Sequence, residues 1–164
     1  MASYPNFDPN AFSKYDHQFW KNRAVVDSFE PGSIFKGVTA AAALESGKIN
    51  IHQSFNCEGG DYEVGSFTIH DHHGHYGSLT LPEIIRVSSN IGSFKIAQIL
   101  GRDQFGEMIK NFGFGSKSGV DFPGEVSGIL SSPSRWSNVQ QGTIAFGQGI
   151  SVTPLQIATA YSAI

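Results

Sequence analysis

Cysteine is almost absent from this sequence of 164 residues, since Cys57 is the only one. A single thiol cannot form an internal disulfide, so the sequence excludes a disulfide-stapled scaffold and does not decide the redox compartment. Long apolar runs are also missing, because the longest, Val38 to Leu44, is far shorter than the ~20 residues that span a bilayer. No basic stretch with a cleavage site opens the chain, and we therefore expect these residues to be soluble.

Charged residues are few, since Lys, Arg, Asp and Glu make up 15% of the chain and leave a formal net charge of -3 at pH 7. No run of Lys or Arg occurs, so the electrostatic footprint of a nucleic-acid or anionic-membrane partner is missing. We therefore expect no nucleic-acid partner. Apolar residues make up 40% of the sequence, which is enough for the core of one domain over residues 1–164.

Both ends of the sequence interrupt a pattern. Residues 1–13 begin abruptly on a short strand-like run with Pro and Asn turns. The final residues stop inside a helical pattern without a C-cap glycine or a polar tail. We therefore expect the sequence to be a piece of a larger protein.

Helix signals alternate with one turn-rich region. Gly, His and turn residues dominate residues 49–79, where alternating runs such as YEVGSFTI predict small hairpins. Thr-Leu-Pro-Glu at Thr80 and Thr-Pro-Leu-Gln at Thr153 are capping patterns, and each predicts the start of a helix. Further predicted helices are an Ala-rich one that begins near Ser33 and stops at Gly47, one over residues 91–100 and one over residues 103–111.

Ser33 and Lys36 lie three residues apart where the Ala-rich helix should begin. About one Ser-x-x-Lys match is expected by chance in a chain of this composition, so the spacing alone proves nothing. Its position is informative, because residues i and i+3 share a helix face and the first turn presents free backbone N–H groups. An apolar setting would lower the pKa of the Lys36 ammonium, and the neutral amine could then activate the Ser33 hydroxyl. The alternative is a capping serine beside an exposed lysine.

Ser-x-Asn is the second short motif, and it occurs twice, at residues 54–56 and at residues 88–90. The first copy lies in the turn-rich region and is typical of an ordinary loop. The second copy lies at the junction of two predicted helices, where a break in the helical hydrogen bonds can aim Ser88 and Asn90 at one cleft. A hydroxyl there can relay a proton, and an amide can orient a substrate carbonyl. The alternative for both residues is helix capping.

A cluster of histidines surrounds an aspartate in the turn-rich region. Its members are His70, Asp71, His72, His73 and His75. With Cys57 or Asp61 nearby the cluster could supply zinc ligands, but the paired spacings of structural zinc sites are absent. We therefore interpret the cluster as a solvated polar loop near a substrate groove and expect no metal.

Several longer motifs agree in order along the whole chain. They are MASYPNFDPN, NRAVVD, EPGSIFKG, SSNIG, FGFG, VDFPGE and TIAFGQGISVTPLQIATAYSAI. Together they resemble the transpeptidase domain of class B penicillin-binding proteins, especially the septal, cell-division type. The resemblance implies a mixed α and β fold of the penicillin-binding protein and β-lactamase type, with a central antiparallel sheet, packed helices and a helical subdomain. This chain would hold mostly the helical part, with a few strands and an incomplete antiparallel sheet.

The resemblance also implies a role for each residue of the two short motifs. By position, Ser33 would be the nucleophile, Lys36 its base, Ser88 a proton relay and Asn90 the residue that holds the substrate amide. The backbone N–H of Ser33 would be half of an oxyanion hole, so Ser33 and Asn90 would both contact the substrate. No cofactor is implied.

One motif of the family is missing from these residues. The resemblance places a Lys-Thr/Ser-Gly strand after the last helix found here, whereas the sequence ends at Ile164. The run Lys117-Ser118-Gly119 comes too early and aligns with the FGFG segment, so we interpret it as a chance match. The missing strand would supply a carboxylate-binding lysine and an oxyanion N–H, and losing one such donor typically costs ~100 to 1,000-fold in rate. We expect the 164 residues alone to be weakly active or inactive.

The implied activity is that of a serine-type D,D-transpeptidase of cell-wall synthesis and cell division. It would cross-link peptidoglycan stem peptides that end in D-Ala-D-Ala, and β-lactam antibiotics would acylate it. The full-length parent would work with cell-division proteins at the extracytoplasmic (periplasmic) face of the bacterial inner membrane, held by an anchor absent here. A serine β-lactamase or β-lactam sensor domain is the alternative within the same chemistry, and VDFPGE disfavours it. A non-catalytic interaction module is the alternative from another class.

Overall fold

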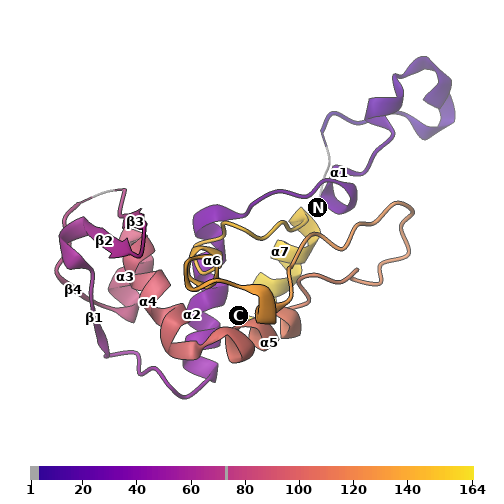
Figure 1. Ribbon diagram of the computed structural model, residues 1–164. Coiled ribbons are helices and arrows are strands. Elements are labelled where there is room, and N and C mark those ends of the chain that lie inside the picture. Colours follow the sequence, from indigo (N-terminus) through magenta and orange to yellow (C-terminus); the bar gives the residue numbers. More distant parts are fainter. Residues whose placement is uncertain (1–3, 73) are drawn as a thin grey trace.

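The computed structural model describes residues 4–72 and 74–164, and helices dominate it (Figure 1). The α-helices are α1 (Arg23–Val26), α2 (Phe35–Glu45), α3 (Leu81–Val87), α4 (Asn90–Leu100), α5 (Arg102–Asn111), α6 (Asn138–Ile144) and α7 (Pro154–Tyr161). The 3-10 helices are η1 (Pro9–Lys14), η2 (His17–Phe19), η3 (Gly32–Ile34), η4 (Glu58–Gly60) and η5 (Pro133–Arg135). The strands are β1 (Ser54–Asn56), β2 (Asp61–Val64), β3 (Phe67–His70) and β4 (Ser78–Thr80). The mixed α and β composition that the sequence predicts is confirmed.

Helix α2 begins and ends where the sequence predicts. The 3-10 turn η3 follows Pro31 and leads directly into α2, and Gly47 after the helix has a left-handed φ of 67°. Alanines favour the helix because they lose no side-chain entropy on folding. One face of α2, which includes Phe35, Val38 and Ala42, is buried in the hydrophobic core.

Helix α4 lies at the centre of the core and contacts α2, α3, α5 and α6 (Figure 1). The approach of α6 is very close, since a Cβ atom at Gly142 would lie 2.0 Å from the ring of Phe94. A second link is the buried side chain of Gln141, which donates a hydrogen bond to the backbone oxygen of Ala97. The position of α4, which carries Asn90, is therefore fixed by packing on several sides.

The strands form two separate antiparallel pairs. Strand β1 pairs with β4, with Ser54 opposite Thr80, and β2 pairs with β3, with Asp61 opposite His70. The second pair is the hairpin that the alternating run YEVGSFTI predicts, and Gly65 supplies the positive φ of 64° that its tight turn requires. The described residues contain few strands and no extended sheet. This agrees with the expectation that the chain holds mostly the helical part of the fold.

Both capping boxes predicted from the sequence are present. At the start of α3 the backbone N–H of Thr80 donates to the Glu83 carboxylate, 2.8 Å away. At the start of α7 the backbone N–H of Thr153 donates to Gln156 at 2.9 Å, and the Thr153 hydroxyl accepts from the Gln156 backbone. These local contacts satisfy backbone donors that a helix start leaves free.

The prediction of a strand within residues 1–13 is wrong for its described part, residues 4–13, and residues 1–3 lie outside the described chain. This part contains turns and η1, which Asp8 caps by accepting from the backbone N–H of Asn10 at 2.9 Å. Pro9 at the first helical position favours the same turn. In Figure 1 the segment projects from the helical body near α1.

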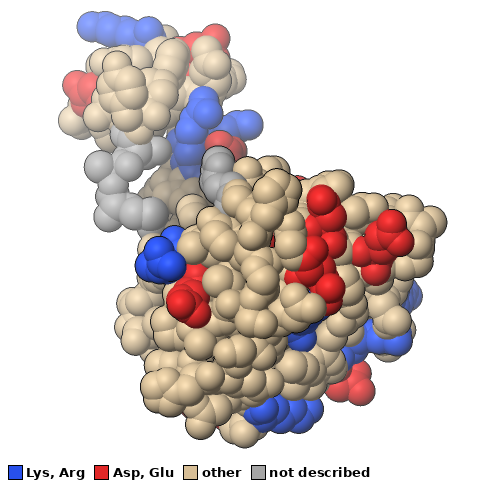
Figure 2. Space-filling view, turned by 90° about the vertical axis from the view of Figure 1, so that its left-hand side faces the viewer, with Lys and Arg blue, Asp and Glu red and all other residues tan. Residues whose placement is uncertain are grey.

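Charged side chains on the face shown in Figure 2 occur in small groups that uncharged surface separates. Within the described residues, no helix has the length and apolar character needed to cross a membrane.

Candidate active site

Ser33 lies in η3, at the entrance to α2, and its side chain is exposed. A loop far along the chain holds this turn in place, because the backbone N–H of Gly32 donates to the Gly147 oxygen at 3.1 Å. The two glycines approach so closely that a Cβ atom at position 147 would lie 2.2 Å from the Gly32 oxygen. The Glu30 carboxylate adds a second link, since it accepts from the backbone N–H of Gly149 at 2.8 Å.

The side chain of Lys36 is buried, with 3% of its surface exposed, and it extends to the junction of α3 and α4. Its Nζ atom donates to the Ser88 backbone oxygen at 2.5 Å, to the Ser88 Oγ at 2.9 Å and to the Asn90 Oδ1 at 2.8 Å. An ammonium group has three N–H donors, so all of them are used. The alternative of an exposed lysine is therefore wrong.

The junction that receives Lys36 is a sharp bend. Ser88 ends α3 in the left-handed conformation, with φ 59° and ψ 43°, and Ser89 caps α4 by accepting from the Gly92 backbone at 2.9 Å. Asn90 is the first residue of α4 and is buried. Ser88 and Asn90 therefore face the same lysine, as the predicted break between two helices requires.

Three of the four predicted residues are thus joined by hydrogen bonds, and Ser33 is the exception. Within the described part of the chain the Ser33 hydroxyl has no hydrogen-bond partner. The donors of Lys36 are occupied by Ser88 and Asn90. Ser33 and Lys36 are still close along the chain, since η3 leads directly into α2 and the lysine lies three residues after the serine. A Lys36 amine that has lost its proton would have a lone pair free to accept from a hydroxyl.

Burial decides the acidity of Lys36. It lowers the pKa of the ammonium from 10.5 to about 8, because the charged form loses hydration, and the carboxylate of Asp71 partly opposes this shift. A pKa near neutrality is what a lysine needs to act as a general base. The shift therefore comes from the burial of Lys36, while the groups in direct contact with its ammonium are polar.

Asp71 is a part of the site that the sequence did not identify as such. Its carboxylate accepts from the backbone N–H groups of Asn90 and Ile91 at 2.6 and 3.1 Å, and from the Ser89 hydroxyl at 2.8 Å. A carboxylate is favoured at this end of a helix, where unpaired N–H groups and the helix dipole attract negative charge. The contact joins residues far apart in the sequence, so no local pattern could have identified it.

The other candidate motifs lie elsewhere. Lys117-Ser118-Gly119 lies in the loop between α5 and η5, where the Ser118 hydroxyl donates to Glu125 at 2.5 Å, and this agrees with a chance match. The first Ser-x-Asn copy is not the ordinary loop expected from the sequence, because it forms β1 and pairs with β4. Its Asn56 accepts from the Glu58 backbone at 2.9 Å.

The histidine cluster is divided among separate contacts. His70 pairs with Asp61 at 2.6 Å, and His75 contacts the Gly59 oxygen at 2.7 Å. His73 lies outside the described residues. Among the residues that are described, no group of three His, Cys, Asp or Glu side chains is placed to hold a metal ion.

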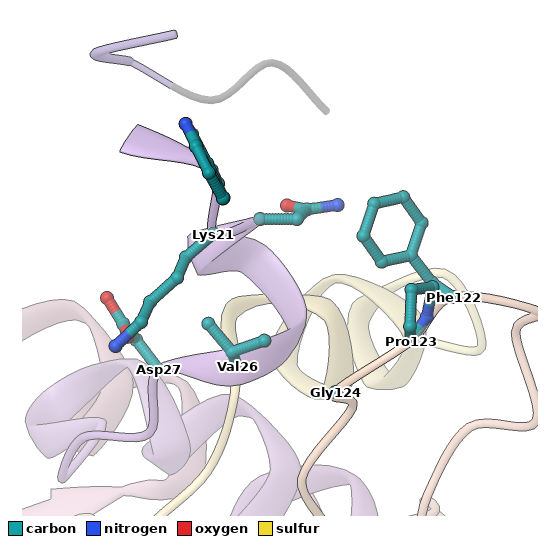
Figure 3. A pocket seen from close by; sticks show the side chains of 8 residues that line it. Lys21, Val26, Asp27, Phe122, Pro123 and Gly124 are labelled. Carbon is teal, nitrogen blue, oxygen red and sulfur yellow. The ribbon is translucent and has the colours of Figure 1, made fainter. Parts of the chain in front are cut away.

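A hollow near the N-terminal segment shares no residue with the predicted site. It lies between the region of α1 and a loop, and Val26, Asp27, Phe122 and Pro123 are among the residues that line it (Figure 3). The site around Lys36 is defined by hydrogen bonds and burial, and not by this hollow.

Comparison with known proteins identifies the family of the chain. A family model described as the penicillin binding protein transpeptidase domain matches residues 1–164. The chain is similar to stage V sporulation protein D of Bacillus subtilis (strain 168), with 40% identity over 165 residues that cover 99% of this chain and 26% of that protein. It is also similar to the probable peptidoglycan D,D-transpeptidase PenA of Neisseria gonorrhoeae, with 35% identity over 164 residues that cover 100% of this chain and 28% of that protein.

The fold has a close match among solved structures. The apo structure of the TP domain from Burkholderia pseudomallei penicillin-binding protein 3 superposes with a TM-score of 0.84 and 34% sequence identity, covering 88% of this chain and 44% of that one. The chain spans about a quarter of the length of the two curated relatives above. The family match, which extends over every residue, shows that the chain belongs to the penicillin-binding protein transpeptidase domains.

Proposed function

We propose that these residues carry the acyl-transfer site of a serine-type peptidoglycan D,D-transpeptidase. The observation that supports this most is the contact of buried Lys36 with both Ser88 and Asn90, which are more than 50 residues away in sequence. A buried lysine with a pKa of about 8, one helical turn after an exposed serine, is a suitable base for a serine nucleophile.

The first step would be attack by the Ser33 oxygen on the carbonyl carbon of a D-Ala-D-Ala peptide bond or of a β-lactam ring. The neutral amine of Lys36 takes the hydroxyl proton as the new ester bond forms. The backbone N–H of Ser33, in the first turn before α2, would stabilise the developing negative charge on the carbonyl oxygen.

The bend at residues 88–90 would complete the step. Ser88, already hydrogen-bonded to Lys36, can pass the proton to the leaving nitrogen as the carbon–nitrogen bond breaks. Asn90 can orient the substrate amide. A D-alanine leaves, and the amino group of a second stem peptide then takes the acyl group and frees Ser33. With a β-lactam the ring nitrogen stays attached, so the serine remains blocked.

The broader biological role is also part of the proposal. We propose that the substrates are peptidoglycan stem peptides and that the site works at the extracytoplasmic face of the inner membrane, together with cell-division proteins. The name of PenA gives peptidoglycan as the substrate of that protein. The name of the B. subtilis relative refers to sporulation. Growth and division phenotypes of cells that lack the protein test the division role.

Covalent labelling tests the chemistry. The longest natural chain that contains these residues is incubated with a fluorescent penicillin, and the labelled peptide is identified by mass spectrometry. We expect one adduct, on Ser33, and none in a Ser33→Ala variant. Ser54→Ala, which removes another exposed serine, serves as the matched control and should label like the wild type.

Two results would contradict the proposal. No adduct, or an adduct on another residue, would exclude Ser33 as the nucleophile. Rapid release of hydrolysed penicillin would indicate a β-lactamase, because a transpeptidase holds the acyl group long enough for its mass to be detected.

A further inference from the structure

Asp71 makes more hydrogen bonds to the start of α4 than capping of this helix requires. Ser89 already caps this helix through its hydroxyl, which accepts from the Gly92 backbone. Asp71 adds a second cap, with Oδ1 bound to the N–H groups of Asn90 and Ile91 and Oδ2 bound to the Ser89 hydroxyl. The carboxylate therefore binds each of the three residues that follow Ser88, which are Ser89, Asn90 and Ile91.

The backbone beside Asp71 fixes the side chain of Asn90 as well. The Asn90 Nδ2 donates to the His70 oxygen at 2.8 Å, so the other end of the amide, Oδ1, is left to face Lys36. His70 ends β3, and the Asp71 N–H donates in turn to the Gly60 oxygen at 3.0 Å. The β2–β3 hairpin thus determines which end of the Asn90 amide meets the lysine.

The charge of Asp71 acts on the same lysine. Within the described chain, Asp71 is the charged group whose field acts on Lys36, while the groups that touch the ammonium, from Ser88 and Asn90, are neutral. The negative charge of this carboxylate favours the protonated amine and opposes the effect of burial. Removing the charge should therefore make Lys36 more acidic.

We propose that Asp71 is a positioning residue of this active site, which holds the bend at residues 88–90 against Lys36 and keeps the lysine ammonium bound there. The proposal rests on the proposed function for its catalytic meaning, but the link between Asp71 and Lys36 can be measured without catalysis. Asp71 acts through Asn90 and Lys36 and does not itself need to contact substrate.

The experiment compares Asp71→Asn with Asp61→Asn in the longest natural chain that contains these residues. Asp61→Asn is the matched control, because it removes the same charge from the first residue of the hairpin that Asp71 follows, where Asp61 is exposed and paired with His70. The pKa of Lys36 is measured by NMR titration of lysine labelled with ¹³C at Cε. The rate of acylation by a β-lactam is then measured across the same pH range.

In Asp71→Asn we expect the pKa of Lys36 to fall by about one unit and the rising limb of the acylation profile to move with it. We expect no shift of either in Asp61→Asn. A residue that only stabilised the fold would lower the melting temperature and leave the pKa of Lys36 unchanged, and that result would overturn the proposal.

A second variant keeps the proposal testable if Asp71→Asn does not fold. Asp71→Ser keeps a short acceptor for the N–H groups of α4 and lacks the charge, so the same fall in pKa is expected. If neither variant folds while Asp61→Asn does, Asp71 is needed for folding and its assignment as a positioning residue is overturned. A wild-type protein without an adduct on Ser33 would contradict the proposed function, whereas an unchanged Lys36 pKa in folded Asp71→Asn would contradict this inference alone.

Discussion

The ammonium of Lys36 donates a hydrogen bond to the backbone oxygen of Ser88, 2.5 Å away and 52 residues later in the sequence. The last carbonyl groups of a helix lack partners within it, and the left-handed turn at Ser88 ends α3 at this point. The lysine thus binds a group that the bend makes available. Lys36, the proposed base, is therefore bound to both the backbone oxygen and the hydroxyl of Ser88, the proposed relay.

Strain at Ser88 gives the first prediction. A left-handed conformation costs a residue with a Cβ about 1–2 kcal/mol, and glycine avoids this cost. Ser88→Gly and Ser88→Ala both remove the hydroxyl, but only glycine relieves the backbone. We expect Ser88→Gly to be more stable than Ser88→Ala by about 1 kcal/mol in urea unfolding, with acylation reduced in both. Equal stabilities would show that the bend is not strained.

The acidity of Lys36 gives the second prediction. Only the neutral amine can accept the Ser33 proton, so the acylation rate should rise with pH and level off above the Lys36 pKa of about 8. Stopped-flow acylation between pH 6 and pH 10 measures this midpoint. A rate that is constant over this range would exclude Lys36 as the base.

The ionisation of Lys36 also predicts how the free energy of unfolding depends on pH. The unfolded chain holds the Lys36 proton up to a pKa of 10.5, while the folded protein releases it near 8. Between these values the unfolded state binds more protons, so the contribution of Lys36 to the free energy of unfolding rises with pH. In Lys36→Met this rise should be absent.

The two Ser-x-Asn copies give the third prediction. Asn90 is buried against Lys36, whereas Asn56 is exposed and contacts the Glu58 backbone. We expect Asn90→Ala to reduce the acylation rate by about 10-fold or more, because loss of a positioning contact in a transition state has effects of this size. Asn56→Ala should differ from the wild type by less than twofold. A comparable loss in both variants would show that the motif at residues 88–90 has no special role.

Packing of α4 gives the fourth prediction. Gly142→Ala gains about 1 kcal/mol of helix propensity, but its Cβ atom would lie 2.0 Å from the ring of buried Phe94. Overpacking of this kind costs about 1–3 kcal/mol, and a rigid ring in a full core places it at the upper end. We expect a net loss of about 2 kcal/mol in urea unfolding. Gly77→Ala, where a Cβ atom meets open space, should be near neutral, and similar values for the two would refute the overpacking argument.

Local chemistry explains which features could be predicted from the sequence. The capping boxes at Thr80 and Thr153, the end of α2 before Gly47 and the β2–β3 hairpin depend on residues within a few positions of one another. The predicted strand near the N-terminus failed for a related reason, since the Asp8 side chain caps a turn that a strand pattern does not reveal. The order of whole motifs along the chain identified the family.

The contacts of Asp71 could not be predicted in this way. Its neighbours in sequence are histidines, and the sequence predicts a solvated polar loop there instead of a helix cap. Its partners, from Ser89 to Ile91, lie 18 to 20 residues later and become neighbours only when the hairpin packs against α4. The burial that sets the pKa of Lys36 likewise comes from the assembled core. The apolar residues near it in sequence indicate that burial is favourable, but they do not show how complete it is.

The turn that carries Ser33 and the helix that follows it are held by residues more than 100 positions later in the sequence. Gly32 is bound to Gly147, and Thr39 of α2 donates to the Ala145 oxygen at 2.8 Å, across 106 residues. During synthesis on the ribosome, α2 therefore emerges long before the residues that fix its entrance. We expect a nascent chain to stay unreactive toward penicillin until residues 145–149 have left the exit tunnel, so the antibiotic would meet only protein whose translation has passed that point.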